Sequence, residues 1–434
     1  MQVMVIVLSG AFLSYKGYID EDKQKWLSKL NLTFFTPCLL FSNIASVISL
    51  DKFTRYWPIP IFYFTFATLS WFLCHLITPF FRVSNLYKRF ITSCVVFNNA
   101  NSLPVAIISS LAVSEAGKTL FWGDDDNQKN VSSRGIAYVL FFGLFSNLLR
   151  WSYGYNILKN EDEDEDENTV FEDESSCSSV PKGKTTSYGS VTEDNNRRKY
   201  SNVSSSTSTS SSSGSQQRKN QQKESTTLLN CNSKNSEDSP LPLIAIKKFF
   251  ISIDKFMSPP LYAAILAIMV GITTPLKTLL YDEDKFLYVS FTKGIESCGK
   301  ASIPLVLVCL GAQLKCIRQS QKDGSVTPPE YRKPVFLSIF IRNLIMPCFV
   351  LPIVYFFARF GGGFSKLQSD PMFIVSMIVV GCTPTAINLA QITQVNGAFE
   401  REMLSVLFWS YGLVCIPIST FVIFLGLLLV KHVF

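Results

Sequence analysis

The chain has 434 residues, of which 47% are hydrophobic and only 17% are charged. A soluble protein typically carries about 25% charged residues, so this composition, with a mean hydropathy of +0.23, favours a membrane protein. The formal net charge is +7, but no dense basic cluster alternates with aromatic residues, so we expect no nucleic acid partner.

Ten hydrophobic stretches predict an all-α integral membrane protein, because roughly 20 apolar residues span a bilayer as a helix. Five stretches precede a polar insert and five follow it, which predicts two membrane domains, residues 1–157 and 248–434. We call the stretches spans one to ten in chain order. They lie near residues 1–15, 28–48, 57–79, 88–113, 135–157, 258–280, 290–314, 334–358, 371–395 and 402–430.

The first stretch, Met1 to Leu13, is short for a membrane span. Its length also suits the apolar core of a signal peptide. No basic segment precedes it and no convincing small-residue cleavage site follows it. We therefore favour a first helix that lacks part of its length over a signal peptide.

The insert, residues 158–247, is polar and of low complexity. An acidic run covers Glu161 to Glu167, and a serine and threonine tract covers Ser204 to Ser213. Few apolar residues are present to offset the entropy of ordering, so we expect disorder. The simplest interpretation is a solvated tether between the halves. The many hydroxyl groups also permit a loop that is regulated by phosphorylation.

Lysine and arginine are concentrated in alternate loops, which predicts the orientation of the chain. The opposite loops are acidic, with Asp124 to Asp126 in one and Asp282 to Asp284 in another. The prediction places the insert in the cytosol, both termini on the lumenal side, and the glycosylation sequon at Asn130 in the lumen. The cations assigned to the cytosolic side are Lys16, Lys23, Lys25, Lys29, Arg82, Lys88, Arg89, Arg150, Lys159, Lys247, Lys248, Lys255, Lys315, Arg318, Lys322, Arg332 and Lys333.

Two pairs of similar segments, in corresponding spans of the two halves, indicate an internal duplication. Pro37 in span two and Pro304 in span seven each precede a leucine-rich run with a small residue, and spans four and nine carry Pro104 and Pro384. Each half has an odd number of spans, so the second half would be inverted relative to the first. The sequence thus predicts two inverted five-helix repeats.

Spans four and nine carry proline and small polar residues near their centres, which predicts two broken helices that cross. Proline removes a backbone donor, and irregular backbone at membrane depth must line protein or water. Such a pair of interrupted spans indicates a transporter binding site, and its helix N-termini favour a small organic anion. The predicted substrate-binding residues are Asn98, Asn99, Asn101, Ser102, Pro104, Thr383, Pro384, Thr385, Asn388 and Gln391, with Pro37, Pro304 and Arg342 in supporting positions.

Alternatives remain for these residues. The asparagines and threonines could instead join neighbouring helices around two proline kinks. Arg342 is either a cation that faces the substrate or a structural group capped by carbonyls. No aspartate or glutamate lies between Lys88 and Val113 or between Met372 and Phe399, which argues for uniport rather than coupling to protons or sodium.

The sequence offers little for catalysis or metal binding. Its eleven cysteines form no CxxC pair, and it has only two histidines, so we expect neither a disulfide framework nor a metal site. Motifs such as HExxH, GxSxG and a phosphate-binding glycine loop are absent from the sequence. We therefore expect no cofactor and no enzyme.

The chain resembles the auxin efflux carrier family, in particular its fungal PIN-like members related to plant PIN-LIKES proteins. The matching segments include FTPCLLFSNIA in span two, NNANSLPVAIISSLA in span four and TPTAINLAQITQVNGAFEREM through span nine. The resemblance implies a fold like that of bile-acid transporters and sodium/proton antiporters. Spans one, two, six and seven would form a scaffold, and the other six would form a transport unit.

The resemblance also implies that Asn101, Pro104, Pro384 and Asn388 surround the carboxylate of the substrate, with an auxin-like acid as one candidate, in the endoplasmic reticulum membrane. We therefore expect a secondary transporter of a small organic anion that works by alternating access among membrane lipids, with homodimerisation left open. One alternative is a non-transporting scaffold or sensor that recruits cytosolic partners through the insert. A channel is a second, less favoured alternative.

Overall fold

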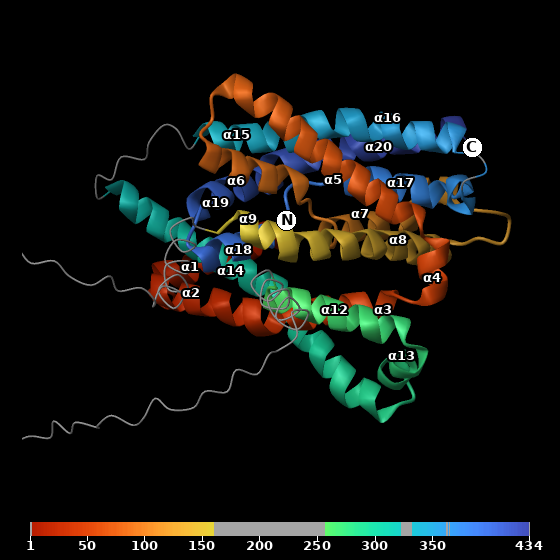
Figure 1. Ribbon diagram of the computed structural model, residues 1–434, viewed down its shortest axis with the longest axis horizontal. Coiled ribbons are helices and arrows are strands. Elements are labelled where there is room, and N and C mark those ends of the chain that lie inside the picture. The colour runs from red at the N-terminus through yellow and green to blue at the C-terminus, as the bar shows by residue number, and fades with distance from the viewer. Residues whose placement is uncertain (1, 160–256, 323–331, 362, 364, 434) are drawn as a thin grey trace, which may run out of the picture. The chain divides into compact units, whose positions relative to one another are not determined.

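The computed structural model describes residues 2–159, 257–322, 332–361, 363 and 365–433 (Figure 1). Almost all of the predicted disordered loop, residues 158–247, lies outside the described residues, as do residues 248–256 of the predicted second repeat. Within the described ranges the secondary structure is helical and contains no strand, apart from one isolated pair of bridging residues.

Helices cover each predicted span. In the first half they are α1 (Gln2–Tyr15), α2 (Glu21–Leu30), α3 (Thr36–Val47), α4 (Leu50–Arg55), α5 (Pro58–Ile77), α6 (Asn85–Val96), α7 (Ser102–Val113), α8 (Gln128–Leu149) and α9 (Tyr155–Ile157). In the second half they are α12 (Pro259–Ile272), α13 (Thr274–Tyr281), α14 (Lys293–Lys322), α15 (Arg332–Phe340), α16 (Met346–Phe360), α17 (Pro371–Gly381), α18 (Leu389–Asn396), α19 (Glu400–Trp409) and α20 (Cys415–Val433). Turns of π-helix at η1 (Asn31–Phe35), η4 (Arg150–Gly154), η5 (Tyr288–Thr292), η7 (Ile341–Ile345) and η9 (Ser410–Val414) continue these helices.

Six continuous helices in the described ranges are long and apolar enough to cross a membrane. A seventh results if α12 and α13, which are bent by 102° at their junction, count as one span. Predicted span one is the 14-residue α1, and spans four and nine are each divided into two short helices. By length and composition these helices make the chain an integral membrane protein. The count of ten spans stays a prediction.

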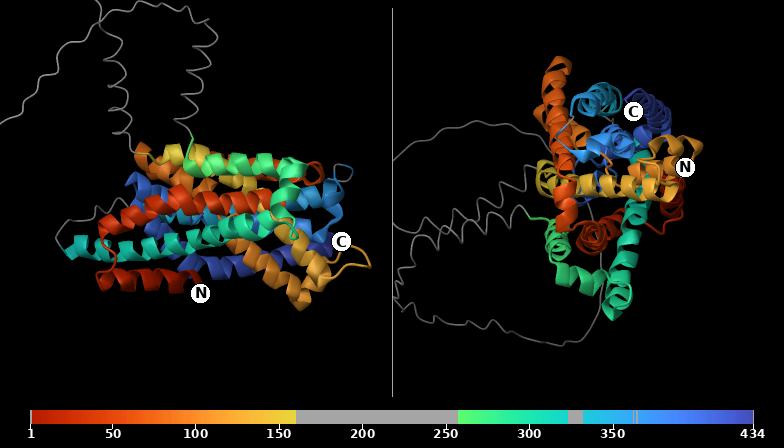
Figure 2. Two further views of the ribbon diagram at one scale, coloured as in Figure 1. Left: turned by 90° about the horizontal axis from the view of Figure 1, so that it is seen from below. Right: turned by 90° about the vertical axis from the view of Figure 1, so that its right-hand side faces the viewer.

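Four helices, α12, α3, α14 and α1, lie side by side in that order (Figure 2). Glycine lets the last two approach closely. A Cβ atom at Gly10 in α1 would overlap the carbonyl oxygen of Val308, and one at Gly311 in α14 would overlap that of Val7. Small residues at such crossings allow backbone contact between membrane helices.

The broken spans lie among the remaining long helices. Helix α17 packs against α7, α8, α16 and α20 (Figure 1). Every residue from Pro371 to Gly381 is buried, as expected for a helix that is apolar on all sides. The break that follows α17 is therefore surrounded by protein, where irregular backbone at membrane depth is tolerated.

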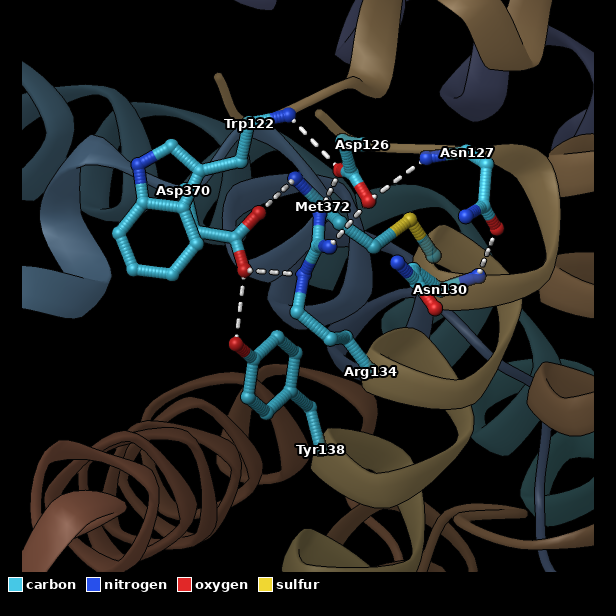
Figure 3. A network of polar contacts seen from close by, with 8 residues as sticks. All are labelled: Trp122, Asp126, Asn127, Asn130, Arg134, Tyr138, Asp370 and Met372. Atoms are coloured by element: carbon cyan, nitrogen blue, oxygen red, sulfur yellow. Dashed lines mark hydrogen bonds and ion pairs between the residues drawn. The ribbon is translucent and has the colours of Figure 1, made fainter. Parts of the chain in front are cut away.

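A network of ionic and hydrogen-bonded side chains fixes the start of α17 against α8 (Figure 3). Asp370 is the N-cap of α17, and its Oδ1 accepts a hydrogen bond from the Met372 amide at 2.9 Å. Its Oδ2 accepts hydrogen bonds from Tyr138 Oη at 2.7 Å and from Arg134 Nε at 3.1 Å. Arg134 also pairs with Asp126 at 2.8 Å.

Asp126 lies in the loop before α8 and shares Arg134 with Asp370. Burial opposes its ionisation, but hydrogen bonds from Arg134 and from the amides of Trp122 and Asn127 outweigh that effect. Together they lower the pKa of Asp126 below its ordinary value of 3.8. The carboxylate is therefore charged at neutral pH and holds Arg134 in place.

Candidate functional site

The two predicted breaks meet. Span four is interrupted between α6 and α7, and span nine between α17 and α18. The backbone amide of Asn99 donates to the carbonyl oxygen of Pro384 at 2.8 Å, and the backbone amide of Ala386 donates to the carbonyl oxygen of Phe97 at 2.9 Å. These bonds flank an antiparallel bridge between Asn98 and Thr385. The breaks thus replace part of the lost helical hydrogen bonding by pairing with each other.

Asn101 and Asn388 occupy corresponding places beside this bridge. Each lies three residues after a bridging residue, and each is the N-cap of the helix that follows, α7 or α18. Neither side chain makes a cap hydrogen bond to its helix. The first turn of a helix carries a partial positive charge. At the start of α18, however, the backbone amides of Leu389 and Ala390 already donate to the carbonyl oxygens of Ala386 and Ile387, at 3.2 and 3.0 Å. The two N-caps therefore present amide side chains and helix N-termini that suit an anion.

The side chain of Asn101 is held against α8. A Cβ atom added at Gly143 would overlap the Asn101 Oδ1 atom, so glycine at this position is what allows the contact. Asn101 and Asn388 are both partly exposed rather than buried. They differ in this from the other polar residues of the breaks, most of which are buried and bonded.

Asn98, Thr383 and Thr385 are buried and hold the backbone of the breaks together. Asn98 Nδ2 donates to the carbonyl oxygen of Val380 at 2.7 Å and to Thr383 Oγ1 at 3.1 Å. Thr385 Oγ1 donates to the carbonyl oxygen of Cys94 at 2.9 Å. These contacts match the structural role that the sequence analysis kept as an alternative for such residues.

Asn99 and Ser102 organise the start of α7. Asn99 Oδ1 accepts hydrogen bonds from the backbone amide of Asn101 and from Ser102 Oγ, both at 3.3 Å. Asn99 Nδ2 donates to Tyr411 Oη at 2.8 Å, and Tyr411 donates to the Thr385 carbonyl oxygen at 2.8 Å. Tyr411, in η9 of span ten, was missed by the sequence analysis, because one tyrosine in an apolar span gives no distinctive signal.

Arg342 caps the ends of two half-helices. It donates to the carbonyl oxygens of Thr383 at 2.7 Å, Gly381 at 2.8 Å and Val95 at 3.3 Å. These carbonyls lie at the C-terminal ends of α17 and α6, where the helix dipole favours a cation. Of the two interpretations left open from the sequence, the contacts of Arg342 match a group capped by carbonyls.

Arg150 reaches the other break from span five. Its Nη2 donates to the carbonyl oxygen of Asn98 at 3.0 Å and to Ser146 Oγ at 2.9 Å, and its Nη1 donates to Asn147 Oδ1 at 3.1 Å. The sequence analysis counted Arg150 among the cytosolic cations of the loop beside the insert, but the residue lies within a helix and not in a loop. The residue is only 2% exposed within η4. A usable signal was present, because predicted span five already enclosed this arginine.

Gln391 lies outside the break, on the face of α18 that meets α3. Its Nε2 donates to Thr36 Oγ1 at 3.0 Å, and Thr36 shares a hydrogen bond with Ser302 of α14 at 3.0 Å. One turn later, Gln394 Oε1 accepts a hydrogen bond from Ser28 Oγ of α2 at 2.8 Å. These buried polar pairs join α18 to the layer that contains α3 and α14.

The four predicted prolines occupy different settings. Pro104 lies in the first turns of α7 and Pro384 within the second break. Pro37 opens α3 directly after η1, whereas Pro304 lies inside α14. Two of the four prolines therefore flank the crossing, and the other two are set in the neighbouring layer.

An apolar cavity of about 20 Å³ adjoins the second break. Its wall includes Ile387 of that break and Tyr411, and α1 and α14 close it from the other side. Such a volume holds about one water molecule, so this space must widen before it admits an organic acid. Among the residues that the structure describes, no group of three or more His, Cys, Asp or Glu side chains is placed to bind a metal ion.

Comparisons with known proteins give a consistent result. Residues 1–423 match a protein family described as "Membrane transport protein". A protein of Schizosaccharomyces pombe named only as an uncharacterized transporter is 33% identical over 99% of this chain and 94% of its own length. A second uncharacterized transporter, from Saccharomyces cerevisiae, is 33% identical over 98% of this chain and 93% of its own. The Arabidopsis thaliana protein PIN-LIKES 2 is 24% identical over 98% of this chain and 92% of its own length.

Proposed function

Because the chain belongs to the membrane transport protein family, also known as the auxin efflux carrier family, we propose that it carries a small organic anion across an intracellular membrane. The family and its relatives make the protein a transporter rather than an enzyme. We propose uniport by alternating access as the mechanism and the endoplasmic reticulum as the location. The insert would lie in the cytosol and both termini in the lumen.

The corresponding N-caps, Asn101 and Asn388, carry this proposal. Two helix N-termini beside one bridge give an anion two partial positive charges, and the two amide side chains add neutral donors. We propose that these two residues contact the carboxylate. Asn98, Asn99, Ser102, Thr383 and Thr385 would shape the breaks around it, and Pro104 and Pro384 would maintain the breaks.

The same correspondence supports the predicted repeats. If residues 1–157 and 248–434 are inverted copies, residues related by the bridge should hold equivalent roles, as Asn101 and Asn388 do at the starts of α7 and α18. The π-turns η4 and η9 also lie in the equivalent spans five and ten. Each sends one side chain, Arg150 or Tyr411, to the carbonyl of a bridging residue.

Alternating access requires one group of helices to move against another. We propose that α1, α3, α12 and α14 belong to the scaffold and that the broken spans move with α8, α16 and α20. The small cavity between Tyr411 and α14 lies at this boundary, so movement there would open the site. Gln391 would act at the same boundary rather than on the substrate.

The test is uptake by the purified protein in proteoliposomes, with labelled acetate, benzoate and indole-3-acetate as probes. We expect saturable uptake of at least one acid. A hydrogen bond to a charged group contributes about 1.5–3 kcal/mol, so Asn101→Ala and Asn388→Ala should each lower kcat/KM about tenfold or more.

The matched control is Asn156→Ala, because Asn156 donates to the carbonyl oxygen of Ser152 away from the breaks, at 2.8 Å. Its flux should stay near that of the wild type. Equal flux in the wild type, Asn101→Ala and Asn388→Ala would contradict the site. No saturable uptake of any acid would contradict the proposed function.

A further inference from the structure

We propose that Arg150 and Arg342 are the fixed positive charges that make this transporter prefer anions over neutral molecules of the same shape. The inference rests on the proposed function and adds two specificity-determining residues to its site. Neither residue needs to contact the substrate, because both act through their charge on the two breaks.

The placement of the arginines is the first support. Arg342 contacts the carbonyls of Gly381 and Thr383 at the start of the second break, and Arg150 contacts the carbonyl of Asn98 in the first. The N-cap Asn101 lies three residues after Asn98, a chain distance of at most about 11 Å. Arg150 thus lies close to the start of α7, and Arg342 lies beside the break that precedes α18.

The lack of a counter-charge is the second support. In the described part of the chain, the hydrogen bonds of Arg150 and Arg342 go to carbonyl, side-chain amide and hydroxyl oxygens, and Arg150 Nε has no partner. Neither arginine forms an ion pair with a carboxylate there. Arg134 offers a contrast, because it lies between two aspartates. Buried charges are normally paired, so two unpaired cations at one crossing leave a net positive charge for an anion to balance.

Burial is the third support. Both guanidinium groups are only 2% exposed, so solvent and salt screen them less than surface charges. At an effective dielectric constant of about 20, a unit charge roughly 10 Å from an anion changes its affinity by about tenfold or more. Arginine keeps its proton throughout the physiological pH range, so this contribution does not vary with pH.

A purely structural role predicts a different outcome. If the arginines only satisfy carbonyls that the breaks expose, their replacement should weaken binding of charged and neutral ligands alike. If they supply the charge, replacement should weaken binding of the anion alone. The ratio of the two affinities separates the roles, whatever happens to total activity.

The experiment measures competition in proteoliposomes that contain the full-length protein. The transported acid of the panel competes with its own unlabelled form or with the matching primary amide, such as indole-3-acetate with indole-3-acetamide. We expect the wild type to prefer the acid. Arg150→Gln and Arg342→Gln should each reduce this preference about tenfold, and Arg150→Lys and Arg342→Lys should retain it near pH 7.

The lysine variants separate the charge of the arginines from their hydrogen bonds. Lysine keeps the positive charge but lacks the planar set of donors with which the guanidinium contacts several carbonyls. An acid preference that the lysine variants retain and the glutamine variants lose would therefore follow the charge and not the geometry of the hydrogen bonds.

The matched control is Arg89→Gln. Arg89 likewise donates to a backbone carbonyl, that of Ile157 at 3.1 Å, but it lies near the start of α6, at the end of that half-helix away from the break. The preference of Arg89→Gln for the acid should equal that of the wild type.

Folded glutamine variants with an unchanged acid preference, or folded lysine variants that lose the preference as the glutamine variants do, would overturn the role of the arginines and leave the proposed function standing. A wild type that carries no acid would overturn both. A wild type that carries an acid with no preference over its amide would overturn only the inference about charge.

Discussion

At the scale of single residues, the structure separates side chains that fix the backbone from side chains that remain available. Asn98, Asn99, Asn101 and Asn388 look alike in the sequence, but the first two are buried and bonded, whereas the last two cap helices without bonding to them. Sequence alone could locate the group, because four polar residues beside a proline are rare in a membrane span. It could not rank the members, because the ranking depends on which partner each side chain meets across the crossing.

Arg134 provides a prediction of stability at this scale. Asp370 is fully buried, and Arg134 is its cationic partner at 3.1 Å. Arg134→Gln would leave that carboxylate without a counter-charge, which typically costs about 3–5 kcal/mol. We expect a clearly lower melting temperature of the purified protein in detergent.

The control for this prediction is Lys118→Gln, which removes an exposed pair with Glu115 at 2.8 Å. Exposed pairs contribute little, so its melting temperature should stay close to that of the wild type. Equal melting temperatures for Arg134→Gln and the wild type would mean that the network in Figure 3 does not stabilise α17.

At the scale of helices, breaks and close approaches position the site. The pattern of proline with asparagine or threonine predicted where spans four and nine are interrupted. Proline alone would not have been enough, because Pro304 lies inside the continuous α14. The approach of α7 to α8 was not predictable, because Gly143 has no sequence feature that indicates contact with Asn101. The turn at η4 was also missed, and with it the route by which Arg150 reaches the first break.

Gly143→Ala tests whether α8 positions Asn101. The added methyl group would overlap Asn101 Oδ1 and displace this side chain. A displacement of about 1 Å in a positioned group can cost up to a hundredfold in rate, so we expect kcat/KM for the transported acid to fall about tenfold or more. The melting temperature should change much less than it does in Arg134→Gln.

Gly426→Ala is the matched control, because a methyl group there meets its nearest neighbour, in Ile378, at an ordinary 3.6 Å. Its transport kinetics should equal those of the wild type. Equal losses in both glycine variants would indicate a general sensitivity of the helices rather than positioning of Asn101.

At the scale of the whole molecule, the membrane helices and the insert are separable in the sequence, and the proposed function assigns transport to the helices alone. Hydropathy predicted where the helices lie, because a bilayer imposes a minimum length on each apolar segment. It could not establish the interface between α18 and the layer of α3 and α14, where Gln391 and Gln394 use hydroxyl partners. Such pairs depend on register between helices far apart in the chain.

Deletion of residues 165–240 tests this division. A transporter of the proposed kind should keep its KM and most of its kcat in proteoliposomes without these residues, because the proposed site lies in spans four and nine. An uninserted chain could mimic a loss of activity, so recovery of the protein from membranes by detergent is the control. A properly inserted deletion variant without uptake would show that the insert is needed for transport.

The two unpaired guanidinium groups have an electrical consequence. Moving one elementary charge through a membrane potential of 100 mV involves about 2.3 kcal/mol. If Arg150 and Arg342 shift along the field during turnover, the empty protein carries two positive charges through part of it, and a bound monovalent anion cancels one. Voltage would then act more strongly on the empty protein than on the loaded one, and the resting potential of the membrane would bias which face the unoccupied site presents.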